Sequence, residues 1–296
     1  MVSKRNVSAI ASESIFFLPA LIIYIIVMII PLFTGLYYSM TDWDGIRKSI
    51  NYIGFQNFSE AFRDSKLLNA TKVTFLFAIV YTSTHNIIGL IAAKIFLKNN
   101  ALNGFCKASL FLPYVLSTLC VSYIWNYMYS PIDGVINGIL AWIGISETPI
   151  NFLGDPKYAL YSAVLTQLWQ AFGFTFIIYI AGLKGIPKSY YEAASIDGAN
   201  GWAKFKCIKL PLLAPVTKIL LVVDFIACLK LFDLFYIMTK GGPGYHTETY
   251  TLMIFREAFS NSRMGYSTAI SIILFLIILA ATSIQITILN KREVDY

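Results

Sequence analysis

The chain has little charge, few cysteines and very little histidine. Charged side chains make up 13% of its 296 residues, about half of the roughly 25% that is usual in soluble domains. So few charges do not cover the surface of a water-soluble globule of this size. The apolar residues, 57% of the total, are gathered in long runs, and about 20 consecutive apolar residues cross the ~30 Å hydrocarbon layer of a membrane. The composition therefore indicates an integral membrane protein.

The scarcity of reactive side chains excludes several classes of enzyme. The two histidines, His85 and His246, are too far apart in the chain to indicate a histidine-rich zinc site. No H-E-x-x-H, G-x-S-x-G or G-x-x-x-x-G-K-[ST] motif occurs, which argues against an intramembrane hydrolase and against ATP hydrolysis by a phosphate loop. The four cysteines do not form an extracellular disulfide framework. We expect no catalytic residue, no metal ion and no cofactor bound by this chain.

Six apolar runs are long enough to cross a membrane. Each predicts a helix, because a helix satisfies its own backbone hydrogen bonds where water is absent. The predicted fold class is therefore all-α and polytopic, with six transmembrane helices. The runs are Ile15 to Tyr38, Val73 to Leu97, Phe105 to Tyr129, Tyr158 to Leu183, Leu212 to Met238 and Gly265 to Asn290.

The distribution of lysine and arginine predicts the orientation. With the amino terminus in the cytoplasm, more of these residues fall on inner than on outer loops, as cytoplasmic loops usually show. We expect a multi-pass protein of the cell (inner) membrane with both termini in the cytoplasm, and the net charge of +7 does not indicate a nucleic-acid partner. The predicted order is a cytoplasmic tail (1–14), a first membrane helix (15–38), an extracytoplasmic loop (39–69), a membrane core (70–290) with a cytoplasmic loop (184–211), and a cytoplasmic tail (291–296).

One outer segment has a helical pattern of its own. Val135 to Ile145 is apolar but too short to span the membrane. We expect a short helix that lies along the outer membrane surface.

The predicted cytoplasmic loop contains the stretch SYYEAASIDGANGWAKFKCIKLP, Ser189 to Pro211, which we name the elbow. Ser189 and Glu192 have the spacing of a capping box that starts a helix, and Gly198 stands where a left-handed residue ends one. Asn200 is a candidate N-cap for a second helix, which we expect Pro211 to end. The sequence predicts two short helices joined by a bend.

Two functions fit such an elbow on local grounds alone. A short helix with small and apolar residues suits a groove on a partner protein. A loop that folds back on its own helix bundle fits equally well. The residue pattern favours the partner, because the segment resembles the EAA loop of ATP-binding-cassette importer permeases, with E-A-A, three residues, G, nine residues and I-x-L-P. The matching residues are Glu192, Ala193, Ala194, Gly198, Ile208, Leu210 and Pro211.

The resemblance extends over nearly the whole chain and includes INFLGDPKYAL and KLFDLFYIMTKGGPGYHTET, which are similar to the carbohydrate branch of these permeases. It implies the type I importer fold and a non-catalytic subunit that forms half of a path for a sugar or oligosaccharide. The implied partners are a second, non-identical permease, two cytoplasmic ATPase subunits that bind ATP and Mg²⁺, an extracytoplasmic sugar-binding protein and membrane lipid. It also implies that the elbow residues couple this chain to the ATPases.

Polar residues inside the runs are candidates for the substrate path, since such groups usually face a cavity or the bundle interior. Amides and aromatic planes match the hydroxyl edges and ring faces of sugars, and in related permeases the fourth helix lines the cavity. The alternative is that these amides bond helix to helix. The candidates are Gln167, Trp169, Gln170 and Phe174 in the fourth run, Tyr123 and Asn126 in the third, and Asn86 in the second.

Asp224, in the fifth run, is expected to bond to a neighbouring helix. It also keeps open an alternative function, an ion-coupled secondary transporter of small polar solutes. Such transporters usually show internal symmetry and broken midplane helices, and the sequence shows neither. Dependence of uptake on ATP rather than on an ion gradient would separate the two.

Overall fold

The computed structural model describes residues 17–97, 100–146 and 148–290, and these are overwhelmingly helical. Within them the β-structure is confined to one isolated bridge between Thr41 and Tyr52, so the all-α prediction is confirmed. The chain divides into two compact units. The first runs to Asp64 and includes Ile254–Ile273, and the second comprises Ser65–Met253 and the residues from Leu274 onward.

The described parts of all six apolar runs are largely helical, and Ile15 and Phe16 of the first run lie outside the described residues. The third run is bent, and the fifth begins at a bend. In the described residues, four helices are long and apolar enough to cross a membrane: Phe17–Tyr38, α4 (Ser65–Ile95), α8 (Ala159–Gly185) and α15 (Met264–Asn290). Two further pairs qualify if each bent pair is one span: α5 (Ala101–Val115) with α6 (Thr118–Met128), bent by 99°, and Gly201–Leu212 with α12 (Ala214–Leu229), bent by 61°.

The third run breaks after Val115, so the prediction of one continuous helix there was wrong. Pro113 lies in the last turn of α5, and Leu116 and Ser117 have extended backbones with ψ of 144° and 137°. Proline lacks the N–H of a helical bond and its ring crowds the preceding turn, so the last turns of α5 are weakened before the break. The sequence had shown no broken helix, which was one argument against a secondary transporter. The break in the third run removes that argument.

The fifth run is also shorter than predicted. α12 ends at Leu229, and a separate helix, α13 (Asp233–Met238), follows after a turn. α13 packs against α6. The predicted span to Met238 was therefore too long, because the apolar sequence continues through the turn between the two helices.

The first unit contains the described part of the first long helix, with a π-helical segment η1 (Ile25–Ile29) followed by α2 (Ile30–Tyr38), and the short helix α3 (Gln56–Arg63). The buried Asn57 amide donates to the carbonyls of Ser39 and Thr41 at 2.8 and 2.9 Å. These bonds join α3 to the end of α2. Later in the chain, η3 (Arg256–Ser260) also belongs to this unit, and α14 (Tyr250–Phe255) crosses the boundary between the units after Met253.

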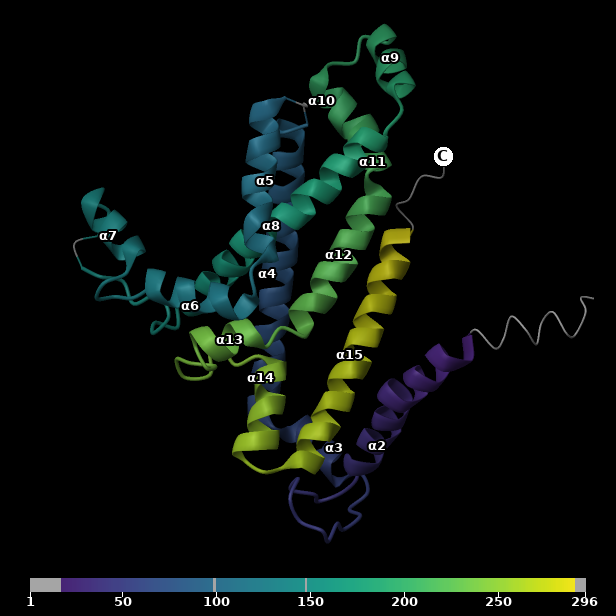
Figure 1. The fold of residues 1–296 in the computed structure, drawn as a ribbon, viewed down its shortest axis with the longest axis vertical. Coiled ribbons are helices and arrows are strands. Elements are labelled where there is room, and N and C mark those ends of the chain that lie inside the picture. The colour runs from purple at the N-terminus through teal and green to yellow at the C-terminus, as the bar shows by residue number, and fades with distance from the viewer. Residues whose placement is uncertain (1–16, 98–99, 147, 291–296) are drawn as a thin grey trace, which may run out of the picture. The chain divides into compact units, whose positions relative to one another are not determined.

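The second unit is built around α4 and α8, which pack against each other, with α5 against α8 and α12 against α4 (Figure 1). At the crossing of α5 and α8, Gly173 allows a close backbone approach: a Cβ at this position would lie 2.4 Å from the Leu110 carbonyl oxygen. This spacing requires a glycine, because no larger residue fits without a shift of one helix.

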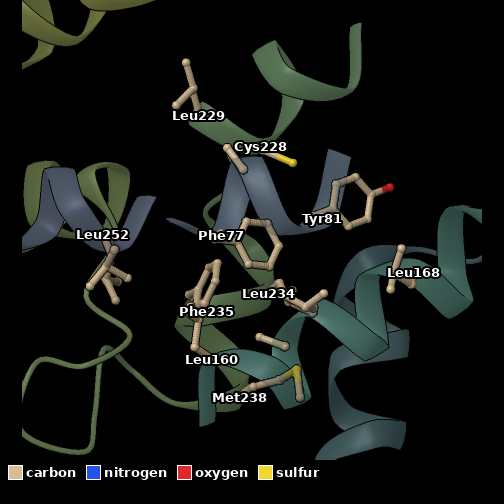
Figure 2. Packing of buried hydrophobic residues seen from close by; sticks show 14 of the residues in the cluster. Phe77, Tyr81, Leu160, Leu168, Cys228, Leu229, Leu234, Phe235, Met238 and Leu252 are labelled. Carbon is tan, nitrogen blue, oxygen red and sulfur yellow. The ribbon is translucent and has the colours of Figure 1, made fainter. Parts of the chain in front are cut away.

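Two buried clusters form the core of the second unit. The first contains Phe77 of α4, whose ring meets Phe235 of α13 edge-on at 5.0 Å, with Tyr81 and Cys228 beside it (Figure 2). The second gathers Phe176 and Tyr179 of α8 with Leu213, which precedes α12. Both clusters hold α8 to α4 and to the fifth run.

A short helix, α7 (Val135–Trp142), lies in the predicted outer segment, so the prediction of a helix there is confirmed. The Asn137 amide donates to the carbonyls of Ser130 and Ile150, and its oxygen accepts the N–H of Ile150. The side chain therefore closes the loop on both sides of α7.

Candidate functional sites

The elbow forms two short helical segments joined by a bend, beyond the ends of α8 and α12 (Figure 1). The first is α9 (Lys188–Ile196). The second runs from Gly201 to Leu212 and comprises α10 (Gly201–Lys204), the π-helical segment η2 (Phe205–Lys209) and α11 (Leu210–Leu212).

The bend has the geometry that the sequence predicts. Gly198 has a φ of +75°, its N–H donates to the Ser195 carbonyl at 3.2 Å, and the Ala199 N–H donates to the Ala194 carbonyl at 2.8 Å. This pair of bonds is the Schellman motif that ends a helix. The Asn200 side chain accepts the Ala203 N–H at 2.8 Å, so its role as the N-cap of the second segment is confirmed.

Two details of the elbow differ from the prediction. α9 begins at Lys188 with Pro187 as its N-cap residue and without a side-chain cap, so Ser189 lies inside the first turn and the capping box is absent. The second segment also continues past Pro211 to Leu212. Just before Pro211, the Leu210 N–H bonds to the Phe205 carbonyl five residues back, and such a wider turn relieves the clash of a proline ring with the preceding turn.

One side of the elbow is fixed to the bundle. Tyr191 and Ile208 pack against the core cluster that contains Phe176 and Leu213, and partial burial raises the pKa of the Tyr191 phenol. The Lys204 ammonium donates to the Ser195 hydroxyl at 2.7 Å, which ties the two segments together. The elbow is therefore supported by packing against the second unit.

Other side chains of the elbow are exposed. The large apolar side chains of Ile196 and Trp202 are 87% and 68% accessible, and Glu192, Ala193 and Gly198 are exposed as well. Of the remaining motif residues, Leu210 is exposed, while Ala194, Ile208 and Pro211 are half-buried. The structure thus brings the motif residues together on one supported elbow with apolar surface open to a partner.

A second candidate site is a cavity of about 150 Å³ within the second unit. Side chains from α4, α5, α8 and α12 line it, together with one residue just beyond α12. The lining residues are Tyr81, His85, Tyr114, Gln167, Ala171, Phe174, Val223, Asp224, Ala227, Cys228 and Leu231.

A buried polar network closes one wall of this cavity. Asp224 Oδ2 lies 2.9 Å from His85 Nδ1 and accepts the Asn86 amide at 3.0 Å. The Tyr179 hydroxyl donates to Asn86 Oδ1 at 2.9 Å. The network joins α12, α4 and α8, and it confirms the expectation that Asp224 bonds to a neighbouring helix.

The predicted substrate-path residues separate into two groups. Gln167 and Phe174 line the cavity, and Phe174 stacks on Tyr114 with ring centroids 5.0 Å apart. Asn86 reaches the cavity wall through its bond to Asp224. Contact of any of these residues with substrate stays a prediction.

The other candidates lie away from the cavity lining. The Gln170 amide donates to the Leu116 carbonyl at 3.0 Å and to Thr118 Oγ1 at 3.3 Å, so it bonds the break between α5 and α6. The Asn126 amide reaches the Ile237 and Met238 carbonyls at 3.4 Å. These are the helix-to-helix bonds of the alternative interpretation. The two remaining candidates lie on the surface: Trp169 meets Trp125 edge-on, and Tyr123 is 65% exposed.

Sequence reasoning did not assign Tyr81, Tyr114, His85 or Cys228 to this site. For three of these residues the sequence does carry a signal, because each belongs to a pair with helical spacing. Tyr81 and His85 are four residues apart, as are Asp224 and Cys228, so each pair shares a helix face. Tyr114 follows Pro113 at the helix break, and its position depends on that break.

Comparison with known proteins agrees with this architecture. Residues 85–294 match the family model described as the inner membrane component of binding-protein-dependent transport systems. The chain is 33% identical, over 95% of its length and 94% of the relative's, to a probable starch degradation products transport system permease protein, AmyD, of Thermoanaerobacterium thermosulfurigenes. It is 34% identical, over 93% of each chain, to the sn-glycerol-3-phosphate transport system permease protein UgpA of Agrobacterium fabrum.

A third relative is the trehalose/maltose transport system permease protein MalF of Thermococcus litoralis, 31% identical over 93% of this chain and 92% of the relative. Among solved structures, a bacterial ABC transporter involved in the import of the acidic polysaccharide alginate matches with a TM-score of 0.84 at 22% identity, over 97% of this chain and 98% of that one. At that identity the likeness supports the fold. The chain belongs to the family of binding-protein-dependent transport system inner membrane components, among the ABC-importer permeases that carry sugars and related solutes.

Proposed function

We propose that this chain is the permease subunit of an ATP-driven importer and forms half of the path for a sugar or oligosaccharide. An external binding protein delivers the solute, and cytoplasmic ATPase subunits drive its passage. Three relatives are named for starch products, trehalose and maltose, or glycerol 3-phosphate. A similar solved importer is in complex with a periplasmic protein that holds an alginate pentasaccharide. These names support a binding-protein-dependent route for a carbohydrate.

The exposed side of the elbow carries the coupling part of the proposal. Ile196 of α9 and Trp202 of α10 are exposed apolar side chains, and both helices lie beyond the ends of α8 and α12 (Figure 1). Exposed apolar surface on a rigid scaffold marks a protein interaction site. Tyr191 and Ile208 pack into the core cluster beside α8 and α12. Movement imposed on the elbow by an ATPase would therefore reach the helices that line the cavity.

A second permease of similar fold completes the path under this proposal. The cavity volume of about 150 Å³ is small for an oligosaccharide, since most ligand pockets measure roughly 300–1,000 Å³. Half of a path shared between two subunits accounts for the small volume. The ATP and Mg²⁺ belong to the ATPase subunits, and the elbow faces the cytoplasm.

The test is uptake into vesicles that contain the assembled complex and its binding protein. ATP should drive sugar uptake, and an ion gradient alone should not. The double variant Glu192→Ala with Gly198→Pro should abolish ATP-driven uptake, because proline does not adopt the φ of +75° found at Gly198. Uptake that needs only an ion gradient, or normal uptake by the double variant, would contradict the proposal.

A matched control separates coupling from folding. Gly144 also has a positive φ, +72°, just after α7, with open space around its Cβ position as at Gly198. Gly144→Pro imposes the same backbone conflict at the end of another short helix. Both Gly144→Pro and the elbow variant should insert into the membrane, and only the elbow variant should lose ATP-driven uptake. That difference would assign the loss to the elbow.

A further inference from the structure

We infer that the cavity selects uncharged or cationic saccharides over anionic ones, and that the Asp224 carboxylate is the selecting group. The inference rests on the proposed function and adds the substrate class. The cavity lining, all of it within the described residues, contains neither lysine nor arginine, and Asp224 is its one carboxylate. A phosphate, sulfate or carboxylate group in the cavity would meet a negative charge and no permanent positive one.

His85 is the nearest partner of the Asp224 carboxylate. His85 is fully buried, its Nδ1 lies 2.9 Å from Asp224 Oδ2, and its Nε2 has no hydrogen-bond partner among the described residues. A proton on Nε2 would bury a donor without an acceptor, which is unfavourable. A neutral imidazole would therefore carry its proton on Nδ1 and donate it to Asp224.

The unsatisfied groups of the wall are acceptors. Besides His85 Nε2, the Gln167 Oε1 atom is buried and lacks a partner among the described residues, and Asp224 accepts hydrogen bonds on Oδ2 only. Acceptors are satisfied by a ligand that donates. Sugar hydroxyls and ammonium groups donate, whereas ionised carboxylates and phosphates only accept.

Another part of the lining suits a sugar ring. Tyr114 and Phe174 stack with an interplanar angle of 18° and form an aromatic surface in the cavity lining. A cavity of this volume, about 150 Å³, admits a six-membered ring such as benzene. One pyranose unit would place its apolar face on the aromatic pair and its hydroxyl edge toward Asp224 and Gln167.

Relatives of this fold are named for charged solutes, glycerol 3-phosphate and the acidic polysaccharide alginate. Selection by charge therefore has to come from side chains and not from the architecture.

Cys228 provides a direct probe, because its thiol lies in the same cavity lining. In the assembled complex with Cys106, Cys120 and Cys207 changed to serine, the rates of Cys228 modification by a cationic methanethiosulfonate (ethyltrimethylammonium) and an anionic one (ethylsulfonate) are each divided by the rate with a free thiol. The normalised cationic rate should exceed the anionic rate. Asp224→Asn should reduce this ratio about tenfold, the order expected for one nearby charge.

The matched control is Asp133→Asn, which removes the same charge from an exposed outer position and should leave the ratio unchanged. If Asp224→Asn does not assemble, Gln167→Lys, which adds a positive charge to the same lining, should lower the ratio in the same direction. Equal ratios in the wild type and Asp224→Asn, or in the wild type and Gln167→Lys, would overturn the inference. So would the absence of any modification, since the cavity would then be closed to solutes.

Transport provides the second measurement. ATP-driven uptake of maltotriose should exceed that of trigalacturonate, and Asp224→Asn should raise the uptake of trigalacturonate relative to maltotriose. Equal uptake of the two by the wild type would overturn the inference while leaving the proposed function intact. Absence of ATP-driven uptake of any sugar would overturn the proposed function, and the thiol rates would still report the charge selection.

Discussion

His85 Nδ1 and Asp224 Oδ2 lie 2.9 Å apart although 139 positions separate the two residues in the chain. Asn86 donates to the same carboxylate oxygen, and Tyr179 donates to Asn86. Three helices, α4, α8 and α12, are thus held at the cavity by one buried carboxylate.

Removal of that carboxylate should destabilise the second unit. Asp224→Ala leaves one Asn86 N–H without its acceptor and removes the nearer partner of His85 Nδ1 in a buried site, which costs about 3 kcal/mol. Asp224→Asn keeps an acceptor oxygen and should cost less. Thermal unfolding of the purified protein in detergent measures both, with the exposed Asp133→Asn as the control. A midpoint for Asp224→Ala equal to that of the control would show that the network contributes nothing to stability.

Gly173 and Gly104 form a matched pair for the packing of α5. Gly173→Ala places a Cβ 2.4 Å from the Leu110 carbonyl oxygen and should destabilise the chain by about 1–3 kcal/mol through overpacking. Gly104 lies within α5 in open space, so Gly104→Ala should stabilise it by roughly 0.5–1 kcal/mol through helix propensity. Thermal unfolding of the purified protein in detergent measures both effects. Similar midpoints for the two variants would contradict the close approach of α5 and α8.

Gln167 and Gln170 differ in role although they stand one helical turn apart. Gln170→Ala removes the bonds to Leu116 and Thr118 at the break between α5 and α6, so we expect a loss of about 1–3 kcal/mol in stability. Gln167→Ala should alter the sugar dependence of transport and leave assembly intact. Thermal stability and the sugar dependence of transport should be measured for both variants. An unstable Gln167→Ala with unchanged transport would show that Gln167 has a structural role instead.

The second helical segment of the elbow depends on its N-cap. Asn200→Ala removes the bond from the Ala203 N–H and should cost about 1 kcal/mol of local stability. Hydrogen exchange at Gly201 to Lys204 should become faster, while exchange in α8 stays the same. Unchanged protection of the segment would show that its packing, and not the cap, holds it.

The parts of the structure that the sequence predicted well have local causes. Gly198 sets the bend of the elbow through its left-handed backbone, and Asn200 starts the second segment through its side-chain cap. The breaks after Val115 and Leu229 escaped prediction, since hydropathy stays high across both turns and does not report the direction of the chain. The capping box failed for a different reason: Pro187, two residues before Ser189, already occupies the N-cap position.

The cavity was predicted only in part because its members come from four helices. Gln167 and Phe174 were found from their spacing on one helix. For Asp224, the cost of burying a carboxylate predicted a bond to a neighbouring helix and not a place in the cavity. Tyr114 and Cys228 reach the same cavity only through the crossing of α5 and α12 with their neighbours. Such contacts depend on tertiary packing and leave no local pattern.

The central claim is that the elbow contacts an ATPase subunit, and photo-crosslinking from the elbow tests it most directly. With the native cysteines changed to serine, Ile196→Cys carries a benzophenone maleimide in the assembled complex, and Ile132→Cys, almost equally exposed at 86% against 87%, is the control on the turn before α7. The account predicts that irradiation joins the elbow residue, and not the control, to an ATPase chain identified by mass spectrometry. A complex that takes up sugar with ATP but forms no such adduct at Ile196 would contradict it.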